Sequence, residues 1–121
     1  MKLIAQFLRF KGIVVKNNFI KKVSFGKSYG IALFPFIFLR KEYKITSQIL
    51  RHEKIHLRQQ VELLIFPFYI WYLVEFIYRF FQYRNASKAY RNISFEREAY
   101  KNDRDVHYLI NRKYYAFIKH L

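Results

Sequence analysis

The stretch RHEKIHLRQQ, residues 51–60, holds two histidines four residues apart with a glutamate directly after the first. Residues four apart share one face of a helix, so His52 and His56 can offer their imidazoles to a single metal ion. Glu53 is displaced by about 100° around the helix and can reach a water bound to that ion. This arrangement is typical of a zinc hydrolase, where zinc lowers the pKa of the water to about 7 and the carboxylate accepts its proton.

A catalytic zinc site needs a third protein ligand, and the chain offers few candidates for it. There is no cysteine, so the ligand must be a histidine or a carboxylate. Glu42 precedes the motif helix, and Glu62 is too near the motif to fold back onto it. Glu75 has Arg79 four residues later as an ion-pair partner. The remaining candidates are Glu96 and Glu98, in the stretch NISFEREAY.

Helical periodicity separates these two carboxylates, because their side chains point about 200° apart on a helix. One stripe contains Ala89, Asn92 or Ile93, Glu96, Tyr100 and Asp103. The other side contains Arg91, Glu98, Lys101 and Asp105 and is expected to be solvated. We therefore favour Glu96 over Glu98 as the third ligand. Asn92 and Tyr100 lie one turn away on either side and are expected to support the ligands by hydrogen bonding.

The strands that must accompany this site are expected in the first third of the chain, where all three glycines lie. Short apolar runs at residues 3–10 and 12–20 predict strands. The stretch IALFPFIFLR, residues 31–40, predicts an edge strand, because Pro35 has no backbone N–H to donate to a neighbouring strand. We expect one metallopeptidase-like domain over residues 1–121, α+β in class and mainly α.

About four helices are expected to carry the metal site, at residues 47–60, 61–83, 87–105 and 106–120. Thr46 or Ser47 is expected to cap the first, which contains the two histidines. The second is apolar on nearly all sides, and Pro67 is expected to kink or break it near its start.

The chain is strongly basic, with 23 Lys and Arg against 8 Asp and Glu, a formal charge of +15. Such a charge predicts an anionic partner, which is a nucleic acid, a membrane surface rich in anionic lipid or an acidic protein. Residues 63–81 can cross a bilayer only if Glu75 and Arg79 are buried or extend to the membrane surface, because the uncharged part spans about 18 Å of a ~30 Å core. The N-terminus lacks the pattern of a signal peptide, so we expect the cytoplasm or the cytoplasmic face of a membrane.

The two motifs together resemble the gluzincin class of zinc metallopeptidases. The similarity is to the compact, membrane-associated kind found in CaaX-processing proteases and in the protease domains of antirepressor-type sensors. It covers residues 31 to about 105 and implies Zn²⁺ held by His52, His56 and Glu96, with Glu53 as general base. It also implies that an extended peptide pairs with the edge strand. The sequence departs at Tyr100, where that class has an aspartate that orients a ligand histidine.

Three functions fit these patterns. The first is zinc-dependent hydrolysis of a peptide or protein at or near a membrane surface, with Tyr100, Arg104 or His107 stabilising the transition state. The second is a non-catalytic, membrane-associated module in which the metal staples the fold. The third is a basic nucleic-acid-binding domain, which ranks last because the charges are spread along the chain. The oligomeric state is left open.

Overall fold

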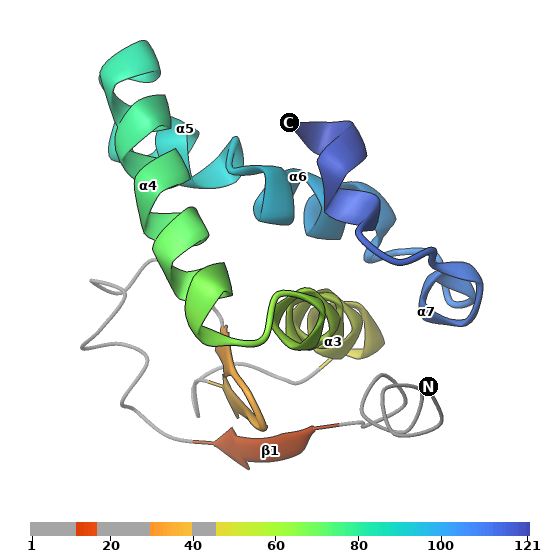
Figure 1. The fold of residues 1–121 in the computed structure, drawn as a ribbon. Helices are drawn as coiled ribbons and strands as arrows, with labels where there is room; N and C mark the ends of the chain where they lie inside the picture. Colours follow the sequence, from red (N-terminus) through yellow and green to blue (C-terminus); the bar gives the residue numbers. More distant parts are fainter. Residues whose placement is uncertain (1–11, 17–29, 40–45) are drawn as a thin grey trace.

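The computed structural model describes residues 12–16, 30–39 and 46–121, which form a small sheet followed by helices (Figure 1). The strands are β1 (Ile13–Lys16), β2 (Gly30–Leu33) and β3 (Phe36–Leu39). The helices are α3 (Ser47–Glu62), α4 (Phe66–Tyr83), α5 (Ala86–Arg91), α6 (Ser94–Asn102), α7 (Tyr108–Asn111) and the 3-10 helix η1 (Ala116–His120). The predicted α+β, mainly α class is confirmed, while the strand predicted at residues 3–10 lies outside the described residues.

The described strands form one sheet in the order β1-β3-β2, with β1 parallel and β2 antiparallel to β3. The prediction of a single strand at residues 31–40 is wrong, because the chain turns at Phe34 and Pro35 and makes a hairpin. Pro35 has no backbone N–H to give to a ladder, so it lies in the turn. Among the described strands β2 pairs only with β3, which makes β2 an edge strand of this sheet.

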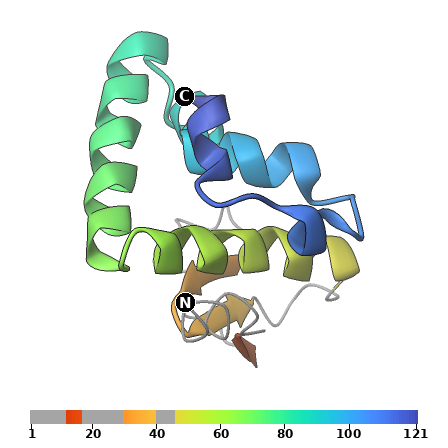
Figure 2. The same cartoon turned by 45° about the vertical axis from the view of Figure 1, so that its right-hand side comes forward.

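α3 lies between the hairpin and α6, as Figure 2 shows, and it carries both histidines of the motif. Thr46 caps the helix as predicted, because its hydroxyl oxygen accepts a hydrogen bond from the Ile49 N–H at 3.1 Å. Leu57 is buried on the side of α3 that faces the strands. It belongs to a core cluster with Ala32, Ile37 and Leu39 of the hairpin.

A side-chain amide also fastens α3 to the hairpin. Gln60 donates from Nε2 to the carbonyl oxygen of Ala32 at 2.6 Å, and its Oε1 accepts the N–H of Phe34 at 2.8 Å. The amide is buried, so it replaces water as the partner of two main-chain groups at the turn end of β2.

The apolar run after α3 is broken just before Pro67, as predicted. Leu64 and Ile65 have positive φ angles of 60° and 70°, and α4 then begins at Phe66 with Pro67 in its first turn. No helix in the described part of the chain is by itself long and apolar enough to cross a bilayer. α3 and α4 meet that criterion only together, as a pair bent by 113°.

The predicted ion pair within α4 is confirmed and has a further role. Arg79 Nη2 lies 3.6 Å from Glu75 Oε2, and Glu75 also accepts the N–H and the hydroxyl of Ser94, each at 2.6 Å. Ser94 is the first residue of α6, so a carboxylate from α4 caps that helix.

The single helix predicted at residues 87–105 is wrong, because it divides into α5 and α6. Asn92 ends α5 and its Nδ2 donates to the Lys88 carbonyl oxygen at 2.7 Å, while Ile93 is extended and fully buried. Ile93 belongs to a second core cluster with Phe68, Phe95 and Phe117. The interruption therefore turns an apolar side chain into the core before α6 begins.

The last helix, predicted at residues 106–120, is also wrong, because only α7 and η1 are helical there. Arg112 has an extended backbone and forms ion pairs with Glu62 and Glu98, and Tyr115 adopts the left-handed conformation. Regular helix would carry the Arg112 side chain away from these two buried carboxylates.

Candidate metal centre

Two turns of α3 and the first turn of α6 bring His52, His56 and Glu96 together. The Nε2 atoms of the two histidines lie 3.2 Å apart. Glu96 Oε1 lies 3.3 Å from His52 Nε2, and Glu96 Oε2 lies 2.8 Å from His56 Nε2. All three residues are buried, and one donor atom from each lies within 4.8 Å of the others.

These separations fit a tetrahedral ion. Two ligand atoms bound to zinc at its usual distances lie about 3.3 Å apart when the angle between them is tetrahedral. Imidazole nitrogens and carboxylate oxygens are also the usual zinc ligands in a chain that, like this one, has no cysteine. The residues present therefore fit a zinc ion, with a fourth position left for water.

His52 is oriented from behind by Asp103, which ends α6 as its C-cap. The Nδ1 of His52 donates to Asp103 Oδ2 at 3.0 Å, which leaves the Nε2 lone pair directed at the centre. Gln48 Nε2 donates to the other carboxylate oxygen at 3.1 Å, and Arg51 Nη1 donates to the Asp103 carbonyl oxygen at 2.6 Å. Asp103 thus supplies the support that was expected, and missing, at position 100.

His56 is oriented by an amide instead. Its Nδ1 lies 2.8 Å from Gln59 Oε1. Gln59 Nε2 donates to the Phe95 carbonyl oxygen at 3.1 Å and to Glu98 Oε1 at 3.0 Å. Because both amide hydrogens are used in this way, the amide oxygen must face His56, so Nδ1 carries the proton and Nε2 presents its lone pair.

Glu98 is not solvated, contrary to the expectation from its helical position. It is fully buried, with Arg112 Nε at 2.5 Å and the Tyr108 hydroxyl at 2.7 Å from its Oε2. Its carboxylate is therefore committed to Arg112, and the structure brings Glu96 rather than Glu98 to the two histidines.

The two predicted supporting residues differ in outcome. The structure does not bring Asn92 to the histidines, because the helix break places it at the end of α5, where its Oδ1 accepts from Arg97. Tyr100 does lie at the site, but as a packing partner. Its ring centroid is 4.5 Å from that of His52 at an interplanar angle of 62°, and its hydroxyl is hydrogen-bonded to Tyr90.

Arg104 and His107 were candidates for stabilising a transition state, and the structure does not bring them to the centre. Both are exposed, and no described hydrogen bond or ion pair joins either side chain to the three ligands. Tyr72 of α4, which sequence reasoning missed, is nearer, since its hydroxyl donates to Glu96 Oε2 at 3.4 Å. It was missed because residues 61–83 contain several tyrosines in one apolar run, and no motif distinguishes Tyr72 from the others.

The electrostatics of the centre favour a cation. Burial lowers the pKa of His56, but Glu96, Glu53 and Gln59 together outweigh it and raise that pKa to about 9. Burial raises the pKa of Glu96, but His56 and His52 outweigh it and hold the pKa well below its usual range. Without a metal, a proton on His56 therefore supplies the positive charge beside Glu96, and a bound metal ion would take the place of that proton.

Glu53 lies beside these residues but outside their hydrogen bonds. Burial raises its pKa, and the attraction of His56 and His52 offsets this only in part. No hydrogen bond joins its carboxylate to another residue in the described part of the chain, although only 6 % of the residue is exposed. A Cβ placed on Gly30 would lie 3.6 Å from Glu53 Oε1, so this carboxylate adjoins the start of β2.

Comparisons with models of protein families, with curated proteins and with solved structures found no match to this chain. The similarity to gluzincins therefore stays a prediction, and it depends on the two motifs and on the geometry of the centre.

Proposed function

We propose that this protein is a zinc-dependent peptidase in which His52, His56 and Glu96 hold the ion and Glu53 is the general base. The observation that carries the proposal is the convergence of three ligand atoms whose outward partners, Asp103 and Gln59, leave both imidazole lone pairs directed inward. A bound zinc ion polarises a substrate carbonyl and acidifies a water molecule.

Glu53 has the properties that proton transfer requires. Its raised pKa and its lack of hydrogen bonds among the described residues allow it to take up a proton and release it again. In the proposed reaction the water oxygen bonds to the peptide carbonyl carbon and the C–N bond breaks. Glu53 carries the proton from the water to the departing amine. An extended substrate is proposed to lie along β2, whose first residue, Gly30, adjoins Glu53.

A metal-stapled module without catalysis is the second candidate, and the burial of the centre favours it. The exposed fractions are only 8 % for His52, 6 % for His56 and 2 % for Glu96. Such burial is typical of ligands to a structural ion that joins two helices. In this case Glu53 would have no chemical role.

Zinc content and peptide hydrolysis, measured on the same preparations, separate the two candidates. We expect one zinc per chain by elemental analysis in the wild type and in His107→Ala, whose histidine is exposed, and loss of zinc in His56→Ala. Glu53→Gln is expected to keep zinc and to hydrolyse a peptide library at least about 100-fold more slowly, as loss of a general base requires. A wild type that binds zinc without hydrolysing any peptide supports the stapled module, and one that takes up no zinc excludes both.

A further inference from the structure

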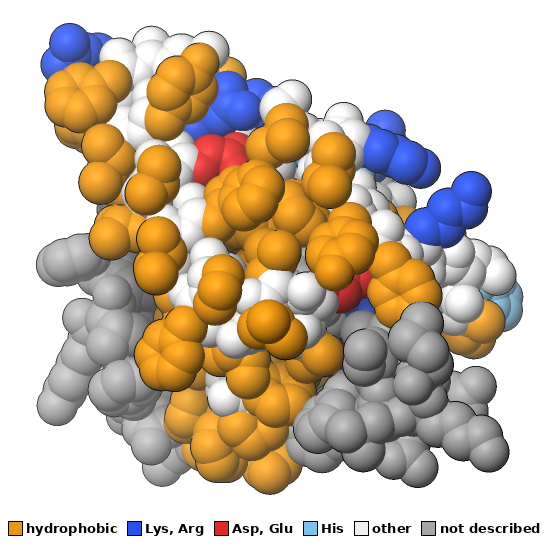
Figure 3. Space-filling view, viewed as in Figure 1, with side chains coloured by type: hydrophobic (Ala, Val, Ile, Leu, Met, Phe, Trp, Pro, Cys, Tyr) orange, Lys and Arg blue, Asp and Glu red, His pale blue; other side chains and the backbone are white. Residues whose placement is uncertain are grey.

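α4 presents an apolar face for which the described part of the chain offers no cover (Figure 3). Six large side chains recur along it at intervals of three or four residues, so they form one stripe about 100° wide. We call this set the outer stripe: Phe66, Ile70, Leu73, Val74, Ile77 and Phe81, each at least 46 % exposed. An apolar surface this continuous is rare on a soluble monomer and marks an interaction site.

No charge interrupts the outer stripe. The two charged residues of α4, Glu75 and Arg79, project from the opposite side, are exposed by only 8 % and 9 %, and pair with each other. Trp71 Nε1 donates to Glu75 Oε1 at 3.2 Å, so the polar atom of the indole also has a partner within the protein. What α4 presents outward is therefore almost entirely hydrocarbon.

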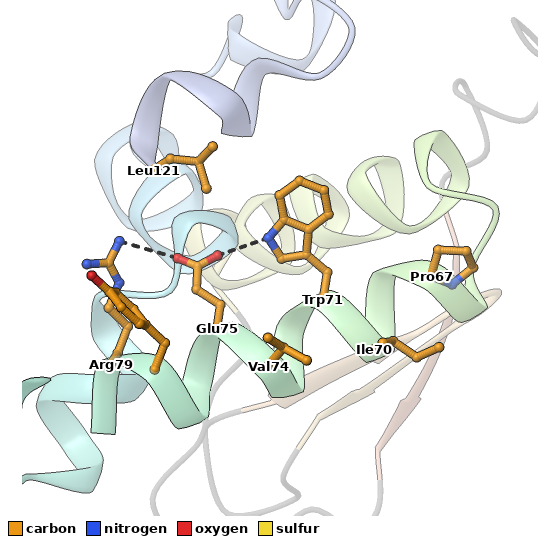
Figure 4. A pocket seen from close by; sticks show the side chains of 8 residues that line it. Pro67, Ile70, Trp71, Val74, Glu75, Arg79 and Leu121 are labelled. Carbon is orange, nitrogen blue, oxygen red and sulfur yellow. Dashed lines mark hydrogen bonds and ion pairs between the residues drawn. The ribbon is translucent and has the colours of Figure 1, made fainter. Parts of the chain in front are cut away.

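A groove of about 620 Å³ runs beside the stripe, between α4 and Leu121, and shares Ile70 and Val74 with it (Figure 4). Its walls are apolar and come from Pro67, Ile70, Trp71, Val74, Tyr78 and Leu121, with the neutralised Glu75 and Arg79 at one end. The groove can admit a hydrocarbon chain, and its paired charges offer no free ion to a polar ligand.

Basic residues lie beside this surface and indicate its occupant. Arg84 follows α4 directly and is exposed, and its guanidinium lies over the ring of Phe81 in the stripe, 5.3 Å from the ring centroid. Lys119 is exposed two residues before Leu121, which lines the groove. The chain as a whole carries a formal charge of +15. A second copy docking on the stripe would bring like charges together, whereas an anionic lipid surface places phosphates against the basic residues and acyl chains against the stripe.

We propose that α4 lies in the surface of an anionic membrane, with the outer stripe among the acyl chains and one acyl chain in the groove. The usual depth for such a helix is about 5–10 Å below the headgroups. This binding is independent of zinc and of hydrolysis, so it stands or falls separately from the proposed peptidase activity.

Trp71 is the only tryptophan of the chain and lines the groove, so its fluorescence reports on the proposal directly. With vesicles that mix phosphatidylglycerol and phosphatidylcholine, we expect its emission to shift to the blue and to be quenched by brominated acyl chains. The double variant Ile70→Glu/Ile77→Glu should bind the vesicles at least about tenfold more weakly in sedimentation, because two apolar anchors are lost. Ile110→Glu, on α7 and 80 % exposed, is the matched control and should bind like the wild type.

Circular dichroism of each variant establishes that it is folded before binding is compared. Equal binding by the double variant and the wild type would overturn the proposal, as would equal loss in Ile110→Glu. A dimer in ultracentrifugation that the double variant abolishes, with no quenching of Trp71, would assign the stripe to a second copy. Binding to single-stranded DNA without binding to vesicles would assign the basic residues to nucleic acid.

Discussion

At the scale of single residues, the two histidines of the centre are held by partners that differ in charge. Asp103 is a carboxylate, so it both orients His52 and makes that imidazole a stronger electron donor. Gln59 is neutral, so it orients His56 without adding charge. Replacing Gln59 therefore removes an orienting hydrogen bond without removing a charge, although its bonds to Phe95 and Glu98 are lost as well.

We expect Gln59→Leu to weaken zinc binding by about 10- to 100-fold, the usual effect of losing a partner of a ligand histidine. Leucine fills a similar volume but cannot accept the Nδ1 proton of His56, so the imidazole is free to rotate or change tautomer. Competition with a chromophoric chelator measures the affinity.

Gln60→Leu is the matched control, because Gln60 is the neighbouring residue and is equally buried but bonds to the hairpin. It should lower the free energy of unfolding and leave the zinc affinity within about twofold of the wild type. Equal zinc affinities in all three proteins would show that Gln59 only fills space.

The three residues that come together at the candidate centre could be predicted from the sequence, whereas the residues that orient them could not. His52 and His56 are local to one helix, and Glu96 follows from periodicity over a short helix. Gln59 and Asp103 depend on how α3 and α6 face each other across the centre, which no pattern within one element contains. Sequence reasoning put Asp103 on the correct stripe but gave it no role, because the expected spacing was one turn and the structure uses two.

At the scale of elements, α4 and α6 are joined through one carboxylate. Glu75 accepts both polar groups of Ser94, the residue that begins α6, and Glu96 follows two residues later. The position of Glu96, the proposed third ligand, thus depends on a charge contributed by the apolar helix α4.

We expect Glu75→Gln to lower the free energy of unfolding by about 3–5 kcal/mol, because it leaves the buried Arg79 guanidinium without a counter-charge. Urea denaturation followed by circular dichroism measures the loss. The double variant Glu75→Leu/Arg79→Leu removes both charges and should be more stable than Glu75→Gln alone. If the double variant is the less stable of the two, the ion pair is not what stabilises this junction.

The elements themselves were predictable where signals are local. The Thr46 cap, the length of α3 and the break at Pro67 all follow from residue types at helix ends. The hairpin at Phe34 and Pro35 was missed because its two strands have one continuous apolar pattern. The interruption between α5 and α6 was missed because it depends on the burial of Ile93 in the core, and the local sequence does not contain that information.

At the scale of the whole molecule, Arg112 ties three distant segments together. Its guanidinium lies 2.7 Å from Glu62 Oε2 at the end of α3 and 2.5 Å from Glu98 Oε2 of α6, and all three side chains are nearly completely buried. Burial raises the pKa of Glu98, but hydrogen bonds from Arg112, Gln59 and Tyr108 outweigh it and hold the pKa below its ordinary value of 4.5.

This shift makes the stability depend on pH in the acid range. A carboxyl with a lowered folded pKa contributes stability that is complete above the ordinary value of 4.5 and is lost as the pH falls through the folded value. We expect urea denaturation of the metal-free protein to show a steeper loss of stability below that pH in the wild type than in Glu98→Gln. Asp105→Asn, at an exposed carboxyl, should follow the wild type, and identical slopes in all three would contradict the role of Glu98.

The amide of Gln60 has a consequence for anything that approaches the edge of β2 that pairs with no other described strand. Alternate residues of a strand direct their main-chain groups the same way, so Gly30 and Ala32 face the same side. Gln60 already occupies Ala32 and Phe34 and leaves Gly30 to other partners. A strand that pairs with this edge would therefore find a main-chain partner at Gly30, beside Glu53, but none at Ala32, and the same restriction would apply to a second copy of the hairpin.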